Sequence, residues 1–329
     1  MMTDWIKGRI SGIAGDSDLL ILLSVVLALL VAGTVFGQCL KLRRSAGPEL
    51  KKLAENFNAR VKSWWMMCFV FAIAMATGGI GSIVLFMLTS FLALREFIAI
   101  VPTRRADHRI IVWCFWVILP LQYLMILTNW YGMFVLLIPV YAFLFVPTRS
   151  VIAGDCEGFL ERTAKIQWGL MACVYCISHA PMLLQIPLKF QDAGLVNARL
   201  LFFLVTVVEM SDVLQYCWGK TCGRHKILPT VSPNKTVEGF IGGILSATLL
   251  GTLLSLVTPF TWYEAALISL TVALAGFAGD VTMSAIKRDC HVKDYGTALA
   301  GHGGILDRID SLCFAAPIFF HLVRYLFSA

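Results

Sequence analysis

Residues 279–310 read GDVTMSAIKRDCHVKDYGTALAGHGGILDRID, and apolar runs flank this polar stretch on both sides. It holds five aspartates, several lysines, arginines and histidines beside them, and three closely spaced glycines. Charged groups next to membrane-spanning segments are costly, so such a cluster needs a reason. An ordinary loop between two helices would not need glycines around a histidine, or paired carboxylates at the start of the next helix. The stretch therefore marks a candidate site.

The composition around this stretch is that of a polytopic membrane protein. Of the 329 residues, 58% are hydrophobic and 14% are charged, whereas a soluble domain carries roughly a quarter charged residues. No small-residue cleavage site follows the first apolar run, so we interpret that run as a retained span and not as a signal peptide. We therefore expect an all-α fold that crosses the membrane about ten times.

The apolar segments define two regions, 1–198 and 199–329, of which the second carries the polar site. A basic, helix-prone segment at 39–62 has apolar residues at helical spacing and predicts an interfacial amphipathic helix. The apolar run 64–100 is too long for one span, and a cluster of glycines in its middle divides it into two. The expected spans are 19–37, two within 64–100, 109–127, 131–147, 166–187, 199–217, 241–258, 263–286 and 309–328.

The basic residues indicate the orientation. Five loops that fall on one side of these spans hold 21 of the 27 lysines and arginines. The positive-inside rule makes this side cytoplasmic, which suits a bacterial inner membrane. The net charge of +7 then reflects topology and a surface that faces anionic lipid or a phosphorylated substrate, so we expect no nucleic-acid partner. A lone C-x-x-C, Cys173 and Cys176, lies in an apolar run and predicts helix packing instead of a metal or redox site.

A first chemical segment spans residues 209–243, EMSDVLQYCWGKTCGRHKILPTVSPNKTVEGFIGG. Ser232 as a helix cap, Pro233 in the first turn and Glu238 near the N-terminus predict a helix start, and a structural role alone would explain these three residues. It would not explain Lys235, because a cation is disfavoured at the positive end of the helix dipole. Free backbone N–H groups, Lys235 and the hydroxyls of Ser232 and Thr236 predict an anion site that suits a polyphosphate. The Walker pattern is absent from the sequence.

The second chemical segment is the stretch quoted first. If the preceding span continues as a helix, Asp280, Ser284 and Lys287 share one face. Asp307 and Asp310 are one turn apart on the next helix. Carboxylates with few soft ligands beside them favour a hard cation such as Mg²⁺ over zinc. Carboxylate-held metal together with lysine and arginine is what phosphoryl transfer requires.

Both segments resemble the phosphatidate cytidylyltransferase (CDP-diacylglycerol synthase) family. Its signature has the form S-x-φ-K-R-x4-K-D-x-G-x2-φ-x-x-H-G-G-φ-x-D-R-φ-D, with D-x-x-x-Y…G+…G+…SP-x-KT-x-EG upstream. The resemblance covers roughly residues 200–329, and the residues before it match only as a set of spans. The residues that match the signature are Ser284, Lys287, Arg288, Lys293, Asp294, Gly296, His302, Gly303, Gly304, Asp307, Arg308 and Asp310. The upstream matches are Asp212, Tyr216, Gly219, Gly223, Ser232, Pro233, Lys235, Thr236, Glu238 and Gly239.

The resemblance implies a reaction in which the phosphate of phosphatidate attacks the α-phosphorus of CTP, releases pyrophosphate and forms CDP-diacylglycerol. It implies Mg²⁺ as cofactor, as one or two divalent ions or beside a monovalent ion, and a homodimer. The metal ligands that it implies are Asp280, Asp307 and Asp310. The catalytic residues that it implies are Asp280, Asp307, Lys287, Arg288 and Arg308. The substrate-binding residues that it implies are Asp212, Ser232, Lys235, Thr236, Glu238, Ser284 and His302.

Two alternatives stay open. One is a related membrane nucleotidyltransferase that acts on another lipid phosphate, because Gln215 stands where many family members have a small residue. The other is a non-enzymatic anion transporter. It is disfavoured because the charges gather in two loops of the C-terminal half and not in paired broken helices. Headgroup transferases that use CDP-lipids carry D-G-x2-A-R, and this chain contains no Asp-Gly dipeptide.

Overall fold

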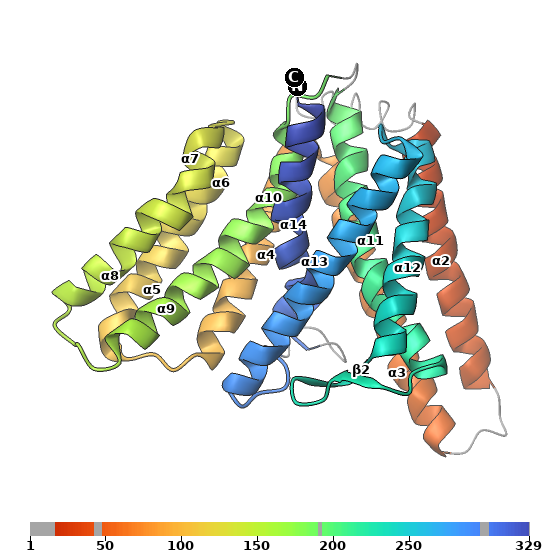
Figure 1. The fold of residues 1–329 in the computed structure, drawn as a ribbon, viewed down its shortest axis with the longest axis horizontal. Coiled ribbons are helices and arrows are strands. Elements are labelled where there is room, and N and C mark those ends of the chain that lie inside the picture. Colours follow the sequence, from red (N-terminus) through yellow and green to blue (C-terminus); the bar gives the residue numbers. More distant parts are fainter. Residues whose placement is uncertain (1–16, 43–47, 190–192, 297–302, 329) are drawn as a thin grey trace.

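The computed structural model describes residues 17–42, 48–189, 193–296 and 303–328, which form a bundle of long helices with one short β-hairpin (Figure 1). Many large apolar side chains on the outer helix faces are exposed, as contact with lipid requires. The chain is therefore an all-α polytopic membrane protein, as predicted. The described residues hold seven helices long and apolar enough to span a bilayer: 78–100, 105–127, 131–152, 195–221, 237–257, 262–289 and 306–327.

Of the segment predicted as an interfacial helix, 39–62, residues 43–47 lie outside the described residues, and the rest belongs to two helices. The first, α2, runs Ser17–Leu42, and α3 runs Pro48–Ala76 without a break. The predicted boundary near residue 62 is wrong, because no Gly or Pro follows Pro48 in this segment to end the helix. The two helices hold apolar runs shorter than the seven spans, at Leu23–Cys39 and Val61–Met75.

The predicted division of 64–100 is confirmed. The helix α4 (Gly78–Ile100) begins directly after Thr77, and Gly78 adopts a φ of 75° in the turn, a conformation that favours glycine. A further helical run at 159–185 coincides with the span predicted at 166–187. This run is not one of the seven helices described above, and the count of ten spans stays a prediction. The elements between α4 and the end of that run are η1 (Arg105–Asp107), α5 (His108–Trp113), η2 (Cys114–Ile118), α6 (Leu119–Leu127), α7 (Tyr131–Leu136), η3 (Leu137–Ala142), α8 (Phe143–Ile152), α9 (Phe159–Leu170), η4 (Met171–Cys176), α10 (Ile177–Met182) and η5 (Leu183–Gln185).

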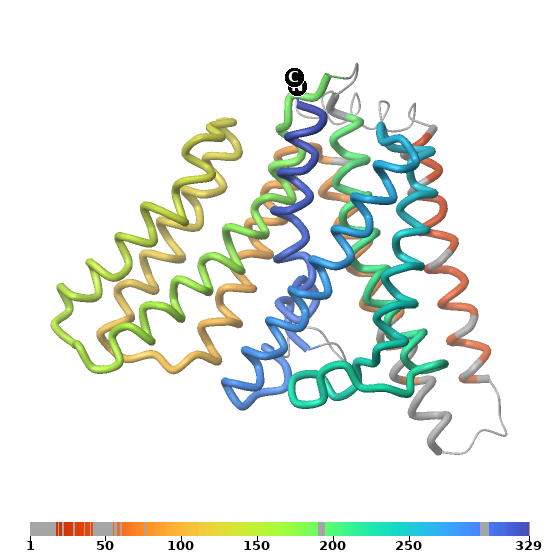
Figure 2. The backbone as a smooth tube through the Cα atoms, in the orientation of Figure 1, coloured from red at the N-terminus to blue at the C-terminus, as the bar shows by residue number. Residues whose placement is uncertain are grey.

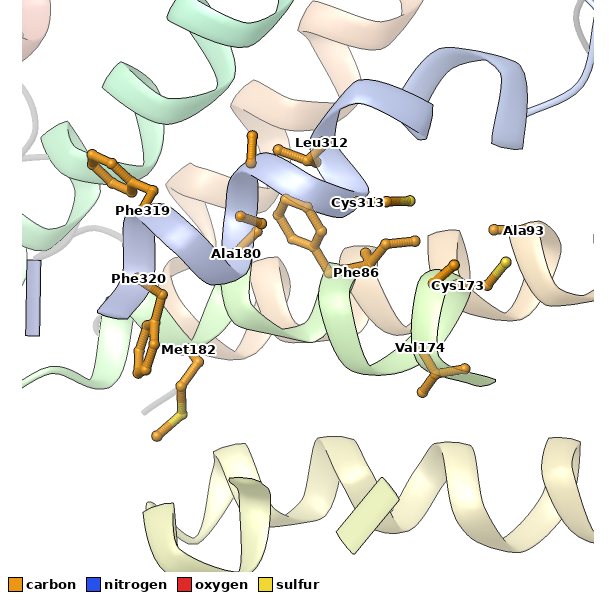
Figure 3. Close-up of a cluster of buried hydrophobic side chains, with 14 of the residues drawn as sticks. Phe86, Ala93, Cys173, Val174, Ala180, Met182, Leu312, Cys313, Phe319 and Phe320 are labelled. Atoms are coloured by element: carbon orange, nitrogen blue, oxygen red, sulfur yellow. The ribbon is translucent and has the colours of Figure 1, made fainter. Parts of the chain in front are cut away.

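The last helix, α14 (Leu306–Phe327), is central to the bundle and packs against α4, α10, α11 (Ala193–Thr221) and α13 (Trp262–Asp289). Figure 3 shows part of this core, where side chains of α14 meet those of α4 and of the η4–α10 run. Cys173 is fully buried there, and all ten cysteines are free, which agrees with the packing role predicted for it. Because α14 contacts both halves of the chain, its N-terminal turn is firmly placed.

Glycines bring α11 and α12 (Val237–Leu253) into close contact. A Cβ atom added at Gly243 would lie 2.6 Å from the backbone nitrogen of Gln215, and one at Gly239 would lie 2.8 Å from its carbonyl oxygen. Small residues let helix backbones approach in this way in membranes. The Gln215 side chain, 8% exposed, donates from Nε2 to Ser211 Oγ. The residue that departs from the family pattern therefore packs within the α11–α12 interface.

The loops that carry the basic residues gather at one end of the bundle. The α4–α5 and α8–α9 turns, the hairpin and the C-terminal end of α13 lie at this end, and the C-terminus lies at the other (Figures 1 and 2). The predicted spans on either side of these loops therefore run in opposite directions through the bundle. That this end faces the cytoplasm stays a prediction from charge alone.

The close approach of α11 and α12 predicts a cost for any side chain at Gly243. Gly243→Ala forces a methyl group against the Gln215 backbone, which cannot move without separating the helices, so we expect a loss of about 1–3 kcal/mol in stability. The midpoint of thermal unfolding in detergent measures this loss. Gly132→Ala is the matched control, since no atom lies within 4 Å of a Cβ placed there. An unchanged midpoint for Gly243→Ala would contradict the close contact.

Candidate active site

The segment before α12 forms a hairpin and not the start of a helix. Strand β1 (Lys226–Leu228) pairs antiparallel with β2 (Ser232–Thr236), and α12 begins only at Val237. The predicted cap at Ser232 is therefore wrong: Ser232 pairs with Leu228 in the hairpin. Strand pairing in β2 holds the Ser-Pro segment extended, so it cannot form the first turn.

Thr236 is the residue that caps α12. Its Oγ1 accepts a hydrogen bond of 3.1 Å from the backbone N–H of Gly239, and the side chain is buried. Two glycines of the upstream motif leave room for it, because a Cβ at Gly223 would lie 2.7 Å from Oγ1 and one at Gly219 would lie 3.2 Å from it. The Val237 N–H donates to His225 O. Part of the predicted anion cradle is thus occupied by the protein itself.

Lys235 joins the hairpin to α13. Its ammonium forms an ion pair with Asp280 and lies 4.8 Å from the centre of the Phe277 ring. The other oxygen of Asp280 accepts a hydrogen bond of 3.2 Å from Ser284 Oγ. The cation that seemed misplaced at a helix start is therefore stabilised by a carboxylate and an aromatic face.

Lys287 joins α13 to α14. Its Nζ donates to Asp307 Oδ1 at 2.8 Å and lies 3.8 Å from Asp310 Oδ2. The Lys287 and Asp307 side chains are only 10% and 4% exposed. The helices meet closely here, because a Cβ at Gly279 would lie 2.7 Å from the Asp310 carbonyl oxygen. Of the predicted shared face, Lys287 therefore contacts α14, whereas Asp280 contacts the hairpin and Ser284.

Asp307 also shapes the loop before α14. Its Oδ2 accepts hydrogen bonds from the backbone N–H groups of Tyr295 at 2.8 Å and Gly304 at 2.9 Å. Gly303 has a φ of 79°, and a Cβ there would lie 2.7 Å from the same oxygen. Burial raises the pKa of the Tyr295 hydroxyl, which stays protonated and donates to Met283 O. Both Asp307 oxygens therefore have protein partners.

A fourth carboxylate completes the group. Asp212 of α11 accepts a hydrogen bond of 2.6 Å from Ser311 Oγ, and the Ser311 N–H donates to Asp310 Oδ1. The charges of Asp212, Asp280 and Asp310 interact, as do those of Asp310 and Asp307. Three helices, α11, α13 and α14, thus bring their carboxylates to one place near the basic end of the bundle.

The other predicted residues lie around this group. Glu238 accepts from the backbone N–H groups of Arg224 and His225, so it organises the turn before β1. Arg288 is exposed and donates to the carbonyl oxygens of Val231 and Val292, which ties the hairpin to the end of α13.

Arg308 and His302 complete the predicted set. The positive charge of Arg308 interacts with the carboxyl groups of Asp212 and Glu209 on α11. Its Nε is buried with no hydrogen-bond partner in the part of the chain that the structure describes. His302 lies outside the described residues.

Two contributors were not among the predicted site residues. Ser311 follows the signature directly and orients both Asp212 and Asp310. Glu96 of α4 accepts hydrogen bonds from the first backbone N–H groups of α14. An acidic residue within a predicted span was a usable signal for Glu96, since such residues are rare and generally paired.

The comparisons with known proteins agree with this geometry. The profile of the cytidylyltransferase family matches residues 58–326. The chain belongs to the cytidylyltransferase family. It is therefore a membrane-embedded nucleotidyltransferase. The match reaches well before residue 200, so the family likeness includes the N-terminal spans as well as the motifs.

Two kinds of relative accompany the family match. The uncharacterized protein YnbB of Escherichia coli (strain K12) is 40% identical over 304 residues, which is 92% of this chain and 97% of that protein. The phosphatidate cytidylyltransferase of Bacillus subtilis (strain 168) is 45% identical over 130 residues, 39% of this chain and 48% of that enzyme. A Staphylococcus epidermidis phosphatidate cytidylyltransferase is 34% identical over 157 residues, 47% of this chain and 60% of that enzyme. The matches to the named enzymes thus cover about half of their lengths.

The buried ion pair predicts a large effect of removing Lys287. Lys287→Met leaves the carboxylates of Asp307 and Asp310 without their cation, and breaking such a buried pair costs about 3–5 kcal/mol. Thermal unfolding in detergent measures the loss. Lys165→Met is the matched control, because its partner Glu161 is 70% exposed and surface pairs contribute about 0–1 kcal/mol. Equal midpoints for the two variants would show that the Lys287 pair is not a tie between α13 and α14.

Proposed function

We propose that this protein is a CTP:phosphatidate cytidylyltransferase that forms CDP-diacylglycerol and pyrophosphate for phospholipid biosynthesis. The observation that carries the proposal is the group of Asp280, Asp307 and Asp310 with the ammonium groups of Lys235 and Lys287 between them. Lys235, Lys287, Asp307 and Asp310 occupy motif positions of the family, Asp280 lies one helical turn before Ser284, and all five come together from the hairpin, α13 and α14.

The reaction needs charge neutralisation more than it needs a protein nucleophile. A phosphate oxygen of phosphatidate forms a bond to the α-phosphorus of CTP, and the bond from that phosphorus to the bridging oxygen breaks to release pyrophosphate. Lys235, Lys287 and Arg308 are the cations in reach of this group, and they would bind the phosphates as negative charge moves onto the leaving group. The lipid phosphate is already an anion, so no side chain has to be activated for attack.

The donor chemistry fits Mg²⁺. Asp280, Asp307 and Asp310 offer only hard oxygen atoms, and their negative charge now faces lysine ammonium groups that stand in for a cation. Within the described residues, no three His, Cys, Asp or Glu side chains are already grouped to hold a metal ion. The carboxylates would hold the ion after exchanging an ammonium contact for it. A bound Mg²⁺ would neutralise phosphate charge and polarise the reacting phosphoryl group.

Location supports the same function. The site lies near the basic end of the bundle (Figure 1), and the positive-inside rule assigns that end to the cytoplasm, where CTP is found. The bacterial relatives and the ten predicted spans suit an inner membrane. A lipid phosphate at the membrane surface and a soluble nucleotide would meet there.

A second candidate is transfer to another lipid phosphate. It is favoured by one observation: the full-length likeness is to YnbB, whereas the phosphatidate cytidylyltransferases match over about half of their lengths. The donor side of the site would be the same in both cases. The difference would lie in the residues that bind the lipid acceptor.

An assay with purified protein, Mg²⁺, labelled CTP and phosphatidate tests the proposal. We expect labelled CDP-diacylglycerol from the native protein and a loss of at least about 10²-fold in Asp280→Asn, because a charged ligand of the proposed Mg²⁺ ion is removed. Asp289→Asn is the control, since it removes the same charge from an exposed position at the end of α13.

The same assay with a series of lipid phosphates separates the candidates. Turnover of phosphatidate supports the first, and turnover of a different lipid phosphate alone supports the second. Absence of transfer from CTP to every acceptor would overturn both. Full activity in Asp280→Asn would remove that carboxylate from the reaction.

Metal binding has a readout that does not depend on turnover. Mg²⁺ at about one hundred times its dissociation constant stabilises a folded protein by about 2.7 kcal/mol. We therefore expect Mg²⁺ to raise the unfolding midpoint of the native protein and EDTA to lower it again. The shift should be smaller in Asp310→Asn, where one ligand has lost its charge, and retained in Asp289→Asn. An equal shift in all three proteins would place the ion elsewhere.

A further inference from the structure

Glu96 reaches the catalytic helix from the N-terminal half of the chain. Its Oε1 accepts a hydrogen bond of 3.0 Å from the backbone N–H of Ile305, and its Oε2 accepts one of 2.8 Å from Leu306. The partners are 209 and 210 residues away in the sequence. The first N–H groups of a helix have no partner within the helix, and a carboxylate is well suited to them. Glu96 thus supplies the cap of α14 from a neighbouring helix.

The same carboxylate accounts for two glycines of the family signature. A Cβ at Gly296 would lie 2.7 Å from Glu96 Oε1, and a Cβ at Gly304 would collide with both oxygens of Glu96. Neither glycine has a positive φ in the described backbone, in contrast to Gly303. The requirement at these two positions is therefore space for the Glu96 side chain and not backbone freedom.

The carboxylates of Asp307 and Asp310 directly follow these contacts in the sequence. Gly304 N–H donates to Asp307, while the next two N–H groups donate to Glu96. The first turn of α14 is thus held by two carboxylates, that of Asp307 in the same helix and that of Glu96 in α4. Any shift of this turn moves Asp307, and it moves Asp310 one turn later as well.

We propose that Glu96 is a positioning residue for the transfer reaction. It fixes the N-terminal turn of α14 and thereby sets where Asp307 and Asp310 point, while it touches no substrate itself. The kinetic part of this inference rests on the proposed function, and the contact itself does not. It gives the N-terminal half of the chain a defined part in the chemistry.

A cap that merely stabilises α14 is the competing explanation. In that case the loss of Glu96 would lower the unfolding midpoint and leave the turnover of the folded protein unchanged. A positioning role predicts that the turnover of the folded protein falls, because a displacement of about 1 Å in a catalytic group costs about 10²-fold in rate. The two explanations differ in kcat and can be separated.

The test is the variant Glu96→Gln, which keeps the side-chain size and loses one of the two acceptor oxygens. We expect kcat for CTP transfer to fall about 10²-fold, with KM for CTP changed much less. Arg95→Gln is a control at the preceding, exposed position of α4. Glu161→Gln is a second control, which removes a negative charge from an exposed ion pair. Both controls should retain native kcat. Native kcat in Glu96→Gln would overturn the proposal.

A double-mutant cycle checks the glycine argument. Gly296→Ala should impair the native protein, because its methyl group meets Glu96. The same substitution in a Glu96→Ala background should cost clearly less, because the obstructing carboxylate is gone. Strictly additive effects would show that Gly296 and Glu96 are not coupled and would count against the proposal.

Amide hydrogen exchange tests the contact without any substrate. The N–H groups of Ile305 and Leu306 should be protected in the native protein and exchange faster in Glu96→Gln. Unchanged exchange would overturn the contact and the proposal with it. If the native protein transfers nothing from CTP, the proposed function fails, and the exchange result still decides whether Glu96 holds this turn.

Discussion

The ion pairs of Lys235 with Asp280 and of Lys287 with Asp307 hold the polar end of the bundle together. A carboxylate at the edge of a bilayer is costly unless a partner neutralises it. Here each partner comes from a different element, so the same contacts that neutralise charge also join the hairpin to α13 and α13 to α14. The groups proposed for the chemistry are therefore also groups that hold the fold together.

Close helix contact makes these pairs reachable. Glycines on α12 and α13 let backbones approach within a distance that any side chain would prevent, as at Gly243 against α11 and Gly279 against α14. Between membrane helices there is little hydrophobic driving force, so packing of this kind carries much of the association. The short side chains of Asp and Ser then reach one another across the interface. A looser bundle would need longer acids and would position them less well.

The sequence was sufficient for the features that depend on local pattern. The spans follow from apolar length, and the shared face of Asp280, Ser284 and Lys287 follows from helical spacing. The helix start at Ser232 was wrong, because β-pairing with Leu228 decides the conformation there and a single sequence does not show pairing. Ser311 lacked a signal of its own. Glu96 was visible as a charge near the membrane, but its partner lies over two hundred residues away and no local rule connects them.

The contact of Glu96 with Ile305 also has a consequence for folding during synthesis. At a synthesis rate of about 5–20 residues per second, roughly 10–40 seconds separate the appearance of the two residues at the ribosome. During that interval α4 is in place with an unpartnered carboxylate, and the glycine-rich turn that will receive it does not yet exist. The group of carboxylates is therefore complete only once α14 has been synthesised. Until then, the growing chain has most of its described helices but lacks the carboxylates of Asp307 and Asp310.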